Sequence, residues 1–319
     1  MTVNIELLHQ IIDEKLKPVV KQVDEQAFYA EEYILALANA GFFDSTNKDV
    51  PTILQDEAAI VRETAKVCMT TAFCIWCHLA ALTYLRHTEN MYLRKTILPQ
   101  IEQGEFLGAT GLSNPMKYYS GLERLHLSAE KTADGYVING TLPAVSNLGQ
   151  RHYFGAVAAL EGREVVVLVS TKAAGLTLKE KIGFIGVNGS ATYSCKFEDV
   201  LIPNEQVIAE DAKTFCDKIR PTFIYYQIPL GAGVIAAAVE GIEKVKAKQN
   251  GSNEYLQVQA ADLETTYKEI LHDLNGVAQQ LTLKSVVPLR LKTVENTLAA
   301  VQANMLHNGA AGYVAGSVP

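Results

Sequence analysis

Three turn-like stretches carry the side chains of this sequence best suited to hold a ligand. They are Leu112-Ser113-Asn114-Pro115, Val145-Ser146-Asn147 and the run from Phe197 to Pro203. Taken singly, Ser-Asn and Ser-Asn-Pro are ordinary turn chemistry, because Ser and Asn bond their local backbone and Pro fixes the turn. Their order within one strand-rich segment favours a second interpretation. Ser113 and Ser146 could donate hydrogen bonds to the polar edge of a flat, mostly apolar ring, and a flavin is such a ring.

The segment that carries these turns lies between two helical segments. Apolar residues recur at helical spacing from residue 4 to about 40 and from 52 to 103. From Phe106 to about Ile208, short apolar runs alternate with turn signals, and Asp134-Gly135 is typical of a tight hairpin. After Phe215 the helical pattern returns, with a face of small residues from Gly231 to Ala238. We therefore expect an α+β fold with three domains, namely an N-terminal helical domain (1–107), a middle antiparallel β-barrel-like domain (108–212) and a C-terminal helical bundle (213–319).

Composition and charge exclude several classes of function. The chain has 319 residues, 48% of them hydrophobic, so it can bury a sizeable core. A net charge of -7 disfavours nucleic-acid and anionic-membrane partners, because both favour basic patches. Neither a run of 18 or more uncharged apolar residues nor a basic, apolar N-terminal stretch occurs. We therefore expect no membrane span and a cytoplasmic location.

The cysteines do not indicate a disulfide framework or a metal site. There are five, an odd and sparse set that predicts reduced thiols: Cys68, Cys74, Cys77, Cys195 and Cys216. Cys74 and Cys77 have metal-ligand spacing and lie beside His78, but the second pair of ligands that a zinc site needs is missing. Buried helix cysteines are the better interpretation, so no metal is expected.

The segment order and the three turns together resemble the acyl-CoA dehydrogenase family of flavoproteins, over nearly the whole chain. Leu112–Pro115 looks like the family's Leu-Thr-Glu-Pro turn, and Asn139–Asn147 resembles its Asn-Gly-x-Lys-x-Trp-Ile-Thr-Asn stretch. The most specific match is Phe197–Pro203, which follows Gly189-Ser190 and is similar to the family's Phe-Glu-Asp-Val-x-Val-Pro after a Gly-Ser turn.

The resemblance implies an FAD-dependent oxidoreductase that oxidises a CH-CH bond next to the activated carbonyl of an acyl-CoA. An electron-transfer flavoprotein or another acceptor would take the electrons, and the assembly would be a homodimer or homotetramer. In this interpretation Leu112 and Ser113 meet the pyrimidine edge of FAD, and Ser146 bonds the reactive side of the ring. The stretch 306–313 resembles the family's Gly-Gly-x-Gly-Tyr turn, where Gly309 lets the backbone approach the dinucleotide.

The sequence departs from the family pattern at several positions. Ala144 replaces the Trp beside the flavin, and Leu142 replaces a Lys. The family's Arg-x-x-Phe-Gly contacts the FAD diphosphate of a neighbouring subunit, and it aligns here with Ala247 in the Arg position and Asn250 in the Phe position. Lys246 or Lys248 could supply the charge, without the bidentate fork of Arg; solvated helix lysines are the competing interpretation. After the first turn, residues 116–121 replace the family's Ala-Gly-Ser-Asp.

The catalytic base is not identified in this sequence. Dehydrogenation needs a carboxylate that removes the proton α to the thioester carbonyl. Most family members place this Glu after the Gly-Gly-x-Gly-Tyr turn, so we expect it beyond Pro319 and expect the C-terminal bundle to be incomplete. Other members place it early in the C-terminal domain, where this chain has no carboxylate between Phe223 and Gln227.

Two other functions stay open at this point. The fold is shared by two-component flavin-dependent monooxygenases. Tyr225, Tyr226 and Gln227 near a flavin would be consistent with that chemistry. His78 is a candidate to stabilise the flavin hydroperoxide that these enzymes form. A histidine on a helix is nonetheless more often structural. The third possibility is a binding or scaffold protein that kept the fold and lost the flavin, which fold alone does not exclude.

Overall fold

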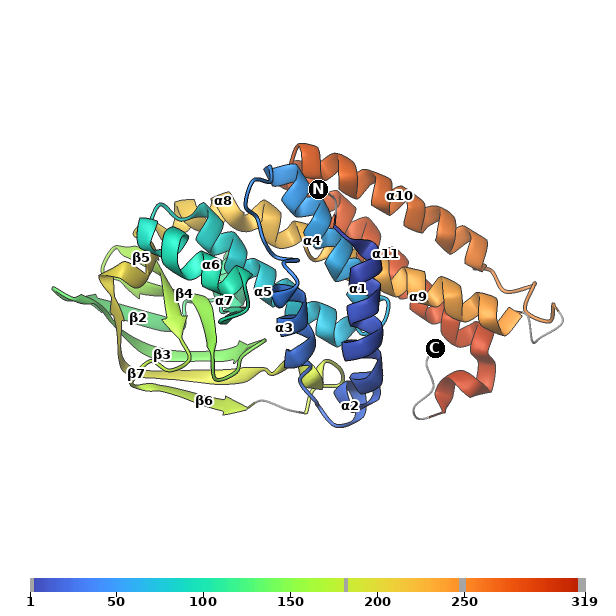
Figure 1. Cartoon of the computed structure of the whole chain (residues 1–319), viewed down its shortest axis with the longest axis horizontal. Coiled ribbons are helices and arrows are strands. Elements are labelled where there is room, and N and C mark those ends of the chain that lie inside the picture. The colour runs from blue at the N-terminus through green and yellow to red at the C-terminus, as the bar shows by residue number, and fades with distance from the viewer. Residues whose placement is uncertain (1–2, 181–182, 247–250, 315–319) are drawn as a thin grey trace. The chain divides into compact units, whose positions relative to one another are not determined.

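The computed structural model describes residues 3–180, 183–246 and 251–314 (Figure 1). Helices form the first part of the chain, and their ends carry the expected signals. Helix α4 starts after Asp49, whose side chain accepts a hydrogen bond from the amide of Thr52, with Pro51 in the first turn. The helices of this part are α1 (Ile5–Ile11), α2 (Val20–Glu25), α3 (Glu31–Asn39), α4 (Val50–Ala65), α5 (Met69–His87) and α6 (Leu98–Glu102), with short turns η1 (Ile12–Leu16), η2 (Lys17–Val19) and η3 (Leu93–Ile97).

The middle of the chain forms one eight-stranded sheet. Its strand order is β6-β7-β3-β2-β4-β5-β8, with β1 paired to β4. The sheet is mixed, because β1 and β2 each pair with β4 in parallel while the other pairings are antiparallel. The strands are β1 (Leu107–Thr110), β2 (Leu127–Lys131), β3 (Gly135–Val145), β4 (His152–Leu160), β5 (Arg163–Ser170), β6 (Leu176–Glu180), β7 (Tyr193–Pro203) and β8 (Val207–Ala209), with helix α7 (Ser113–Tyr118) after β1 and the turns η4 (Asn188–Ser190) and η5 (Asn204–Gln206).

The predicted hairpin at Asp134-Gly135 is confirmed. It joins the antiparallel strands β2 and β3. Gly135 has φ +154°, and a Cβ added there would collide with the backbone of Ile202 on β7. Glycine is therefore required both by the backbone conformation and by the close approach of the neighbouring strand.

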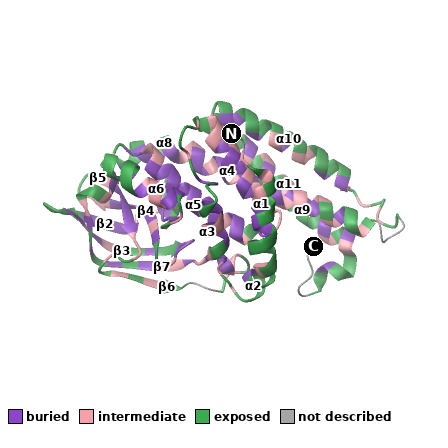
Figure 2. Ribbon diagram, in the orientation of Figure 1, coloured by how far each residue is buried: buried purple, intermediate pink, exposed green. Residues whose placement is uncertain are grey.

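The chain returns to helix after β8, as expected. Helix α11 starts with a reciprocal capping box between Thr282 and Ser285. Figure 2 shows exposed residues along α10, whereas α5 is mostly buried, as are the strands β4 and β5. The helices are α8 (Ala212–Tyr225), α9 (Ile228–Lys246), α10 (Ala260–Gln279) and α11 (Leu283–Asn308), followed by the turn η6 (Gly309–Tyr313).

The chain divides into two compact units. The sheet unit joins residues 22–46 to 74–223, and the helical unit joins residues 1–21, 47–73 and 224–319. Each unit thus combines segments that are distant in the sequence. The boundaries of the three predicted domains stay a prediction.

The predicted face of small residues on α9 is confirmed within the helical unit. A Cβ added at Gly231 would press on Thr293 and Thr297 of α11. One added at Gly233 would collide with the carbonyl oxygen of Arg62 on α4. These glycines let α9 approach α4 and α11 closely, so the packing of this unit depends on the absence of side chains.

One helical stretch among the described residues, Ala212–Lys246, is long and apolar enough to cross a membrane by length and composition alone. Its most apolar window has a mean hydropathy of 1.5, and 61% of that window is buried inside the structure. The core helix of a globular protein passes the same test, so this stretch is weak evidence for a membrane span.

We predict opposite effects for alanine at two helix glycines. Gly233→Ala should lower the free energy of unfolding by about 1–3 kcal/mol, because the methyl group meets the backbone of α4. Gly276→Ala is the matched control on α10, where no atom lies within 4 Å of the added Cβ, and it should raise stability by about 1 kcal/mol. Urea unfolding of both variants measures the difference. Equal shifts in the same direction would contradict the packing of α9 on α4.

Candidate functional site

The first turn presents a serine to solvent above a buried leucine. Leu112 is completely buried; its amide donates to Thr110 Oγ1 at 3.2 Å, and its carbonyl accepts from the amide of Met116 at 3.0 Å. Ser113, the first residue of α7, is exposed. The hydroxyl of Ser113 can therefore reach a ligand, whereas Leu112 contributes apolar packing beneath it.

The second turn lies next to the first. Ser146 follows the end of β3 and forms an antiparallel bridge with Thr110 at the end of β1. Its side chain is part-buried, and its Oγ lies 2.8 Å from Thr192 Oγ1, which lies 2.7 Å from Ser190 Oγ. The Thr110 hydroxyl also makes a short hydrogen bond with Tyr84 OH of α5. The structure therefore brings Ser146 into a row of three hydroxyls whose protons can be oriented together.

The prediction of a turn at Phe197–Pro203 is wrong, because this run forms part of strand β7 and pairs with β3; the preceding Gly189-Ser190 stretch supplies the partner of Asn147. Gly189 and Ser190 lie in η4, and β7, which carries Phe197–Pro203, pairs with β3 in antiparallel register. Ser190 accepts a hydrogen bond from the amide of Asn147 at 2.9 Å. Three stretches far apart in the sequence thus meet within the sheet unit. Glu198 forms an exposed ion pair with Lys196 on the same strand, at 2.7 Å.

The remaining predicted positions differ in exposure and in neighbours. Ala144 is exposed on β3. Lys246, at the end of α9, is exposed and lies 3.7 Å from Glu243, which offsets part of its charge. Gly309 caps α11 with φ +55°, and no atom lies within 4 Å of a Cβ added there. Both Lys246 and Gly309 belong to the helical unit, and Ala247, Lys248 and Asn250 lie outside the described residues.

The donor chemistry of the sheet unit fits the edge of a flavin ring. Ser113 is exposed and Ser146 is half-buried, and Leu112 supplies an apolar base. Such a set of a few polar groups beside apolar packing is what a ring with one polar edge requires. Ala144 provides no aromatic wall, so the fit rests on hydrogen bonding more than on stacking.

His78 is a buried, neutral side chain. Its Nδ1 accepts a hydrogen bond from the amide of Gly108 at 3.0 Å, and its ring centroid lies 4.5 Å from that of Phe43. Burial lowers the pKa of His78 to about 3. These contacts favour a structural role for His78 over stabilisation of a flavin hydroperoxide.

The two cysteines with metal-ligand spacing are buried helix residues, as predicted. All five are free and buried, and Cys74 and Cys77 lie on α5. Burial raises the pKa of the Cys77 thiol well above its usual value. Among the residues that the structure describes, no group of three or more His, Cys, Asp or Glu side chains could hold a metal ion.

The structure adds residues that sequence reasoning missed. Arg220 of α8 donates to the carbonyl of Met116 and to Ser120 Oγ, both at 3.1 Å, and so fixes the segment after α7. In the helical unit, Tyr226 donates a short hydrogen bond to the buried carboxylate of Glu57. A carboxylate from α4 therefore reaches the Phe223–Gln227 neighbourhood, where the local sequence has none. A glutamate on the buried side of an amphipathic helix was the available signal.

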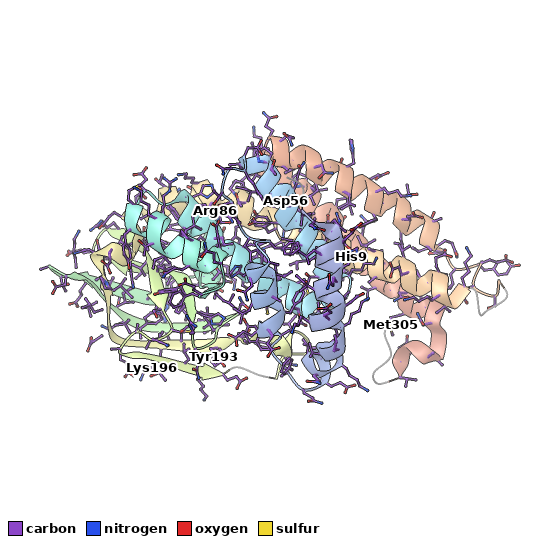
Figure 3. The ribbon with its side chains drawn as sticks, viewed as in Figure 1. His9, Asp56, Arg86, Tyr193, Lys196 and Met305 are labelled. Carbon is purple, nitrogen blue, oxygen red and sulfur yellow. The ribbon has the colours of Figure 1, made fainter. Side chains whose placement is uncertain are left out.

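A cavity of about 520 Å³ opens in the sheet unit. Its lining includes Tyr29, Phe106, Gly149, Arg151 and Tyr193, the last labelled at the start of β7 in Figure 3. The Arg151 guanidinium lies over the Phe106 ring, 5.3 Å from its centroid. Tyr29 connects this cavity to Asn147, because its hydroxyl donates to Asn147 Oδ1 at 2.7 Å.

Comparison with known proteins finds relatives that act on acyl-CoA thioesters. No family model matches the chain. It is 23% identical over 222 residues to the acryloyl-CoA reductase (NADH) of Anaerotignum propionicum, covering 66% of this chain and 56% of the relative. It is 25% identical over 227 residues to a short-chain-specific acyl-CoA dehydrogenase of Clostridium acetobutylicum, covering 66% of this chain and 58% of that relative. The matches thus span a little over half of the length of these relatives.

Solved structures show the same fold at low identity. The butyryl-CoA dehydrogenase of Megasphaera elsdenii superimposes with a TM-score of 0.86 at 17% identity, covering 97% of this chain and 88% of that one. A chain in a structure of the electron transferring flavoprotein of Acidaminococcus fermentans superimposes with a TM-score of 0.87 at 15% identity. The match covers 97% of this chain and 87% of that one. The resemblance predicted from the sequence is therefore confirmed, and the chain is a relative of the acyl-CoA dehydrogenases with the fold of that family.

Proposed function

We propose that this protein is a flavoprotein oxidoreductase of the acyl-CoA dehydrogenase type, which oxidises a CH-CH bond next to the carbonyl of an acyl thioester. The observation that carries the proposal is the bridge between Thr110 and Ser146, which sets the hydroxyl of Ser146 beside the turn that presents Ser113. Two hydroxyl donors, one at the start of α7 and one directly after β3, suit a ring with one polar edge.

The chain's own residues would hold FAD in the following way. Bound FAD would supply the acceptor for the hydride. Ser113 would bond the pyrimidine edge above Leu112, and Ser146 would bond the reactive side, because serine keeps the hydroxyl of the family's threonine. Lys246 would meet the diphosphate of FAD held by a neighbouring subunit, and the bare backbone at Gly309 would let that dinucleotide approach. Ala144 would leave a wider pocket.

The proposed substrate class is an acyl-CoA. The relatives named above are an acryloyl-CoA reductase and acyl-CoA dehydrogenases, and a further structural neighbour is a glutaryl-CoA dehydrogenase with glutaryl-CoA bound. An electron-transfer flavoprotein is the proposed acceptor and the cytoplasm the proposed location. We assign no catalytic base.

Visible absorption of the purified protein tests this function. After addition of FAD, flavin bands should appear in the protein fraction and should bleach under an acyl-CoA without oxygen. Bands that persist under the thioester, together with oxygen uptake that needs a reductase, would indicate the monooxygenase instead. A protein that stays colourless with FAD would contradict flavin binding and favour a scaffold.

We predict that Ser146→Ala weakens FAD binding roughly tenfold, because losing one hydrogen bond to the ring costs about 1.4 kcal/mol. Titration of the apoprotein with FAD measures the dissociation constant. Ser128→Ala is the control, since Ser128 is an exposed serine on β2 of the same sheet and should leave the constant unchanged. Equal effects of the two variants would remove Ser146 from the proposed site.

We also propose that the protein is a homo-oligomer assembled through α11. Large apolar side chains follow one face of this helix at spacings of three and four residues and remain exposed, 54% for Leu291 and 68% for Leu298. Such a stripe buries itself against a second helix in a left-handed pair. Its members are Leu283, Val287, Leu291, Val294, Leu298 and Val301.

The double variant Leu291→Lys with Leu298→Lys should convert the oligomer to a monomer, because charges would have to be buried in the contact. Size-exclusion chromatography with light scattering gives the mass. Leu122→Lys is the control, an equally exposed leucine of the sheet unit that should leave the mass unchanged. A wild-type protein that is monomeric at all concentrations would contradict this assembly.

A further inference from the structure

The residue after Ser146 has an unusual backbone conformation. Asn147 is completely buried and has φ +62°, in the left-handed region that side-chain-bearing residues rarely adopt. Asn tolerates this region better than most residues with a side chain, and the conformation sets the direction in which the chain leaves β3. The position of the neighbouring Ser146 hydroxyl therefore depends on what holds Asn147.

Hydrogen bonds at three atoms hold Asn147. Its backbone amide donates to the carbonyl of Ser190 at 2.9 Å. Its side-chain Nδ2 donates to the carbonyl of Gly108 at 2.8 Å, which fixes the orientation of the amide because a carbonyl only accepts. Its Oδ1 accepts from the hydroxyl of Tyr29 at 2.7 Å. Tyr29 comes from the segment before α3, 118 residues earlier in the chain.

The hydroxyl of Tyr29 is itself oriented by a histidine. Because its one proton points to Asn147, the Tyr29 oxygen must accept from His152 Nε2, 3.2 Å away. His152 is buried, and burial lowers its pKa to about 4, so the ring is neutral near pH 7. The tautomer with its proton on Nε2 is the one in which the neutral ring donates to Tyr29.

The bonds form one directed chain through the interior of the sheet unit. His152 donates to Tyr29, Tyr29 to Asn147, and Asn147 to the carbonyl of Gly108, where the chain ends. In a separate bond, the amide of Gly108 donates to His78. Hydrogen bonds aligned in one direction in a low-dielectric interior strengthen one another. Removing one member leaves its neighbours buried without that bond.

We propose that Tyr29 and Asn147 are positioning residues for the flavin-contacting hydroxyl of Ser146. This inference rests on the proposed function. Neither side chain touches the ring; Tyr29 holds the amide of Asn147, Asn147 holds the left-handed turn, and the turn aims Ser146 and its partners Thr192 and Ser190.

A double-mutant cycle on FAD affinity tests the inference. Tyr29→Phe should weaken FAD binding about fivefold and shift the visible flavin band. In the Ser146→Ala background it should have almost no further effect, because the hydroxyl that it positions is already absent. Tyr136→Phe is the control, since Tyr136 is a buried tyrosine of the same unit whose hydroxyl bonds Glu210. It should lower Tm without changing FAD affinity.

Variants at Asn147 separate the backbone effect from a general loss of stability. Asn147→Ala should weaken FAD binding more than Asn147→Gly, because glycine keeps the left-handed turn at no steric cost. Effects of Tyr29→Phe and Ser146→Ala that add fully, or equal effects of Tyr29→Phe and Tyr136→Phe, would overturn the positioning role alone. A wild-type protein that binds no FAD would overturn the proposed function and this inference together.

Discussion

The candidate site depends on strand β1 being held against helix α5. A Cβ at Gly108 would collide with Ala81, so only glycine allows this approach, and the Gly108 amide donates to His78 on the same helix. Two residues on, Thr110 bonds the hydroxyl of Tyr84. Because β1 also pairs with β4 and bridges Ser146, its anchoring on α5 fixes both serine turns at once. The hydroxyls that would meet a ligand are thus attached to the most buried helix of the sheet unit.

The helical unit obeys a different constraint. Its interior relies on glycines of α9 that admit α4 and α11, whereas α11 keeps an apolar stripe on its outer side. Close packing within the unit and an exposed apolar face on the same helix have separate physical reasons. The glycines of α9 bring the helices into close contact where a side chain would not fit. The stripe on α11 leaves apolar surface in water that a second helix could cover. Lys246 and Gly309, the residues proposed for the dinucleotide, both belong to this unit.

Features set by local sequence were predictable, and features set by long-range contacts were not. The strand-rich middle, the Gly135 hairpin and the α9 glycines follow from periodicity and turn chemistry, and the structure confirms them. The parallel pairings of β1 and β2 with β4 join distant segments, so no local pattern announces them. The same holds for Tyr29, which reaches Asn147 across the chain, and for Glu57 beside Tyr226. The sequence also did not reveal that Leu112 is buried with its amide already bonded.

The departures from the family pattern change which interactions would recognise the ring. Ala144 in place of tryptophan removes a large stacking surface, while Ser113 and Ser146 keep the hydroxyl donors. Stacking tolerates small displacements, but a hydrogen bond weakens steeply as its angle falls. A pocket that relies on hydroxyls therefore needs them held more rigidly than a pocket closed by an aromatic wall. The buried bonds around Asn147 and the anchoring of β1 on α5 supply that rigidity.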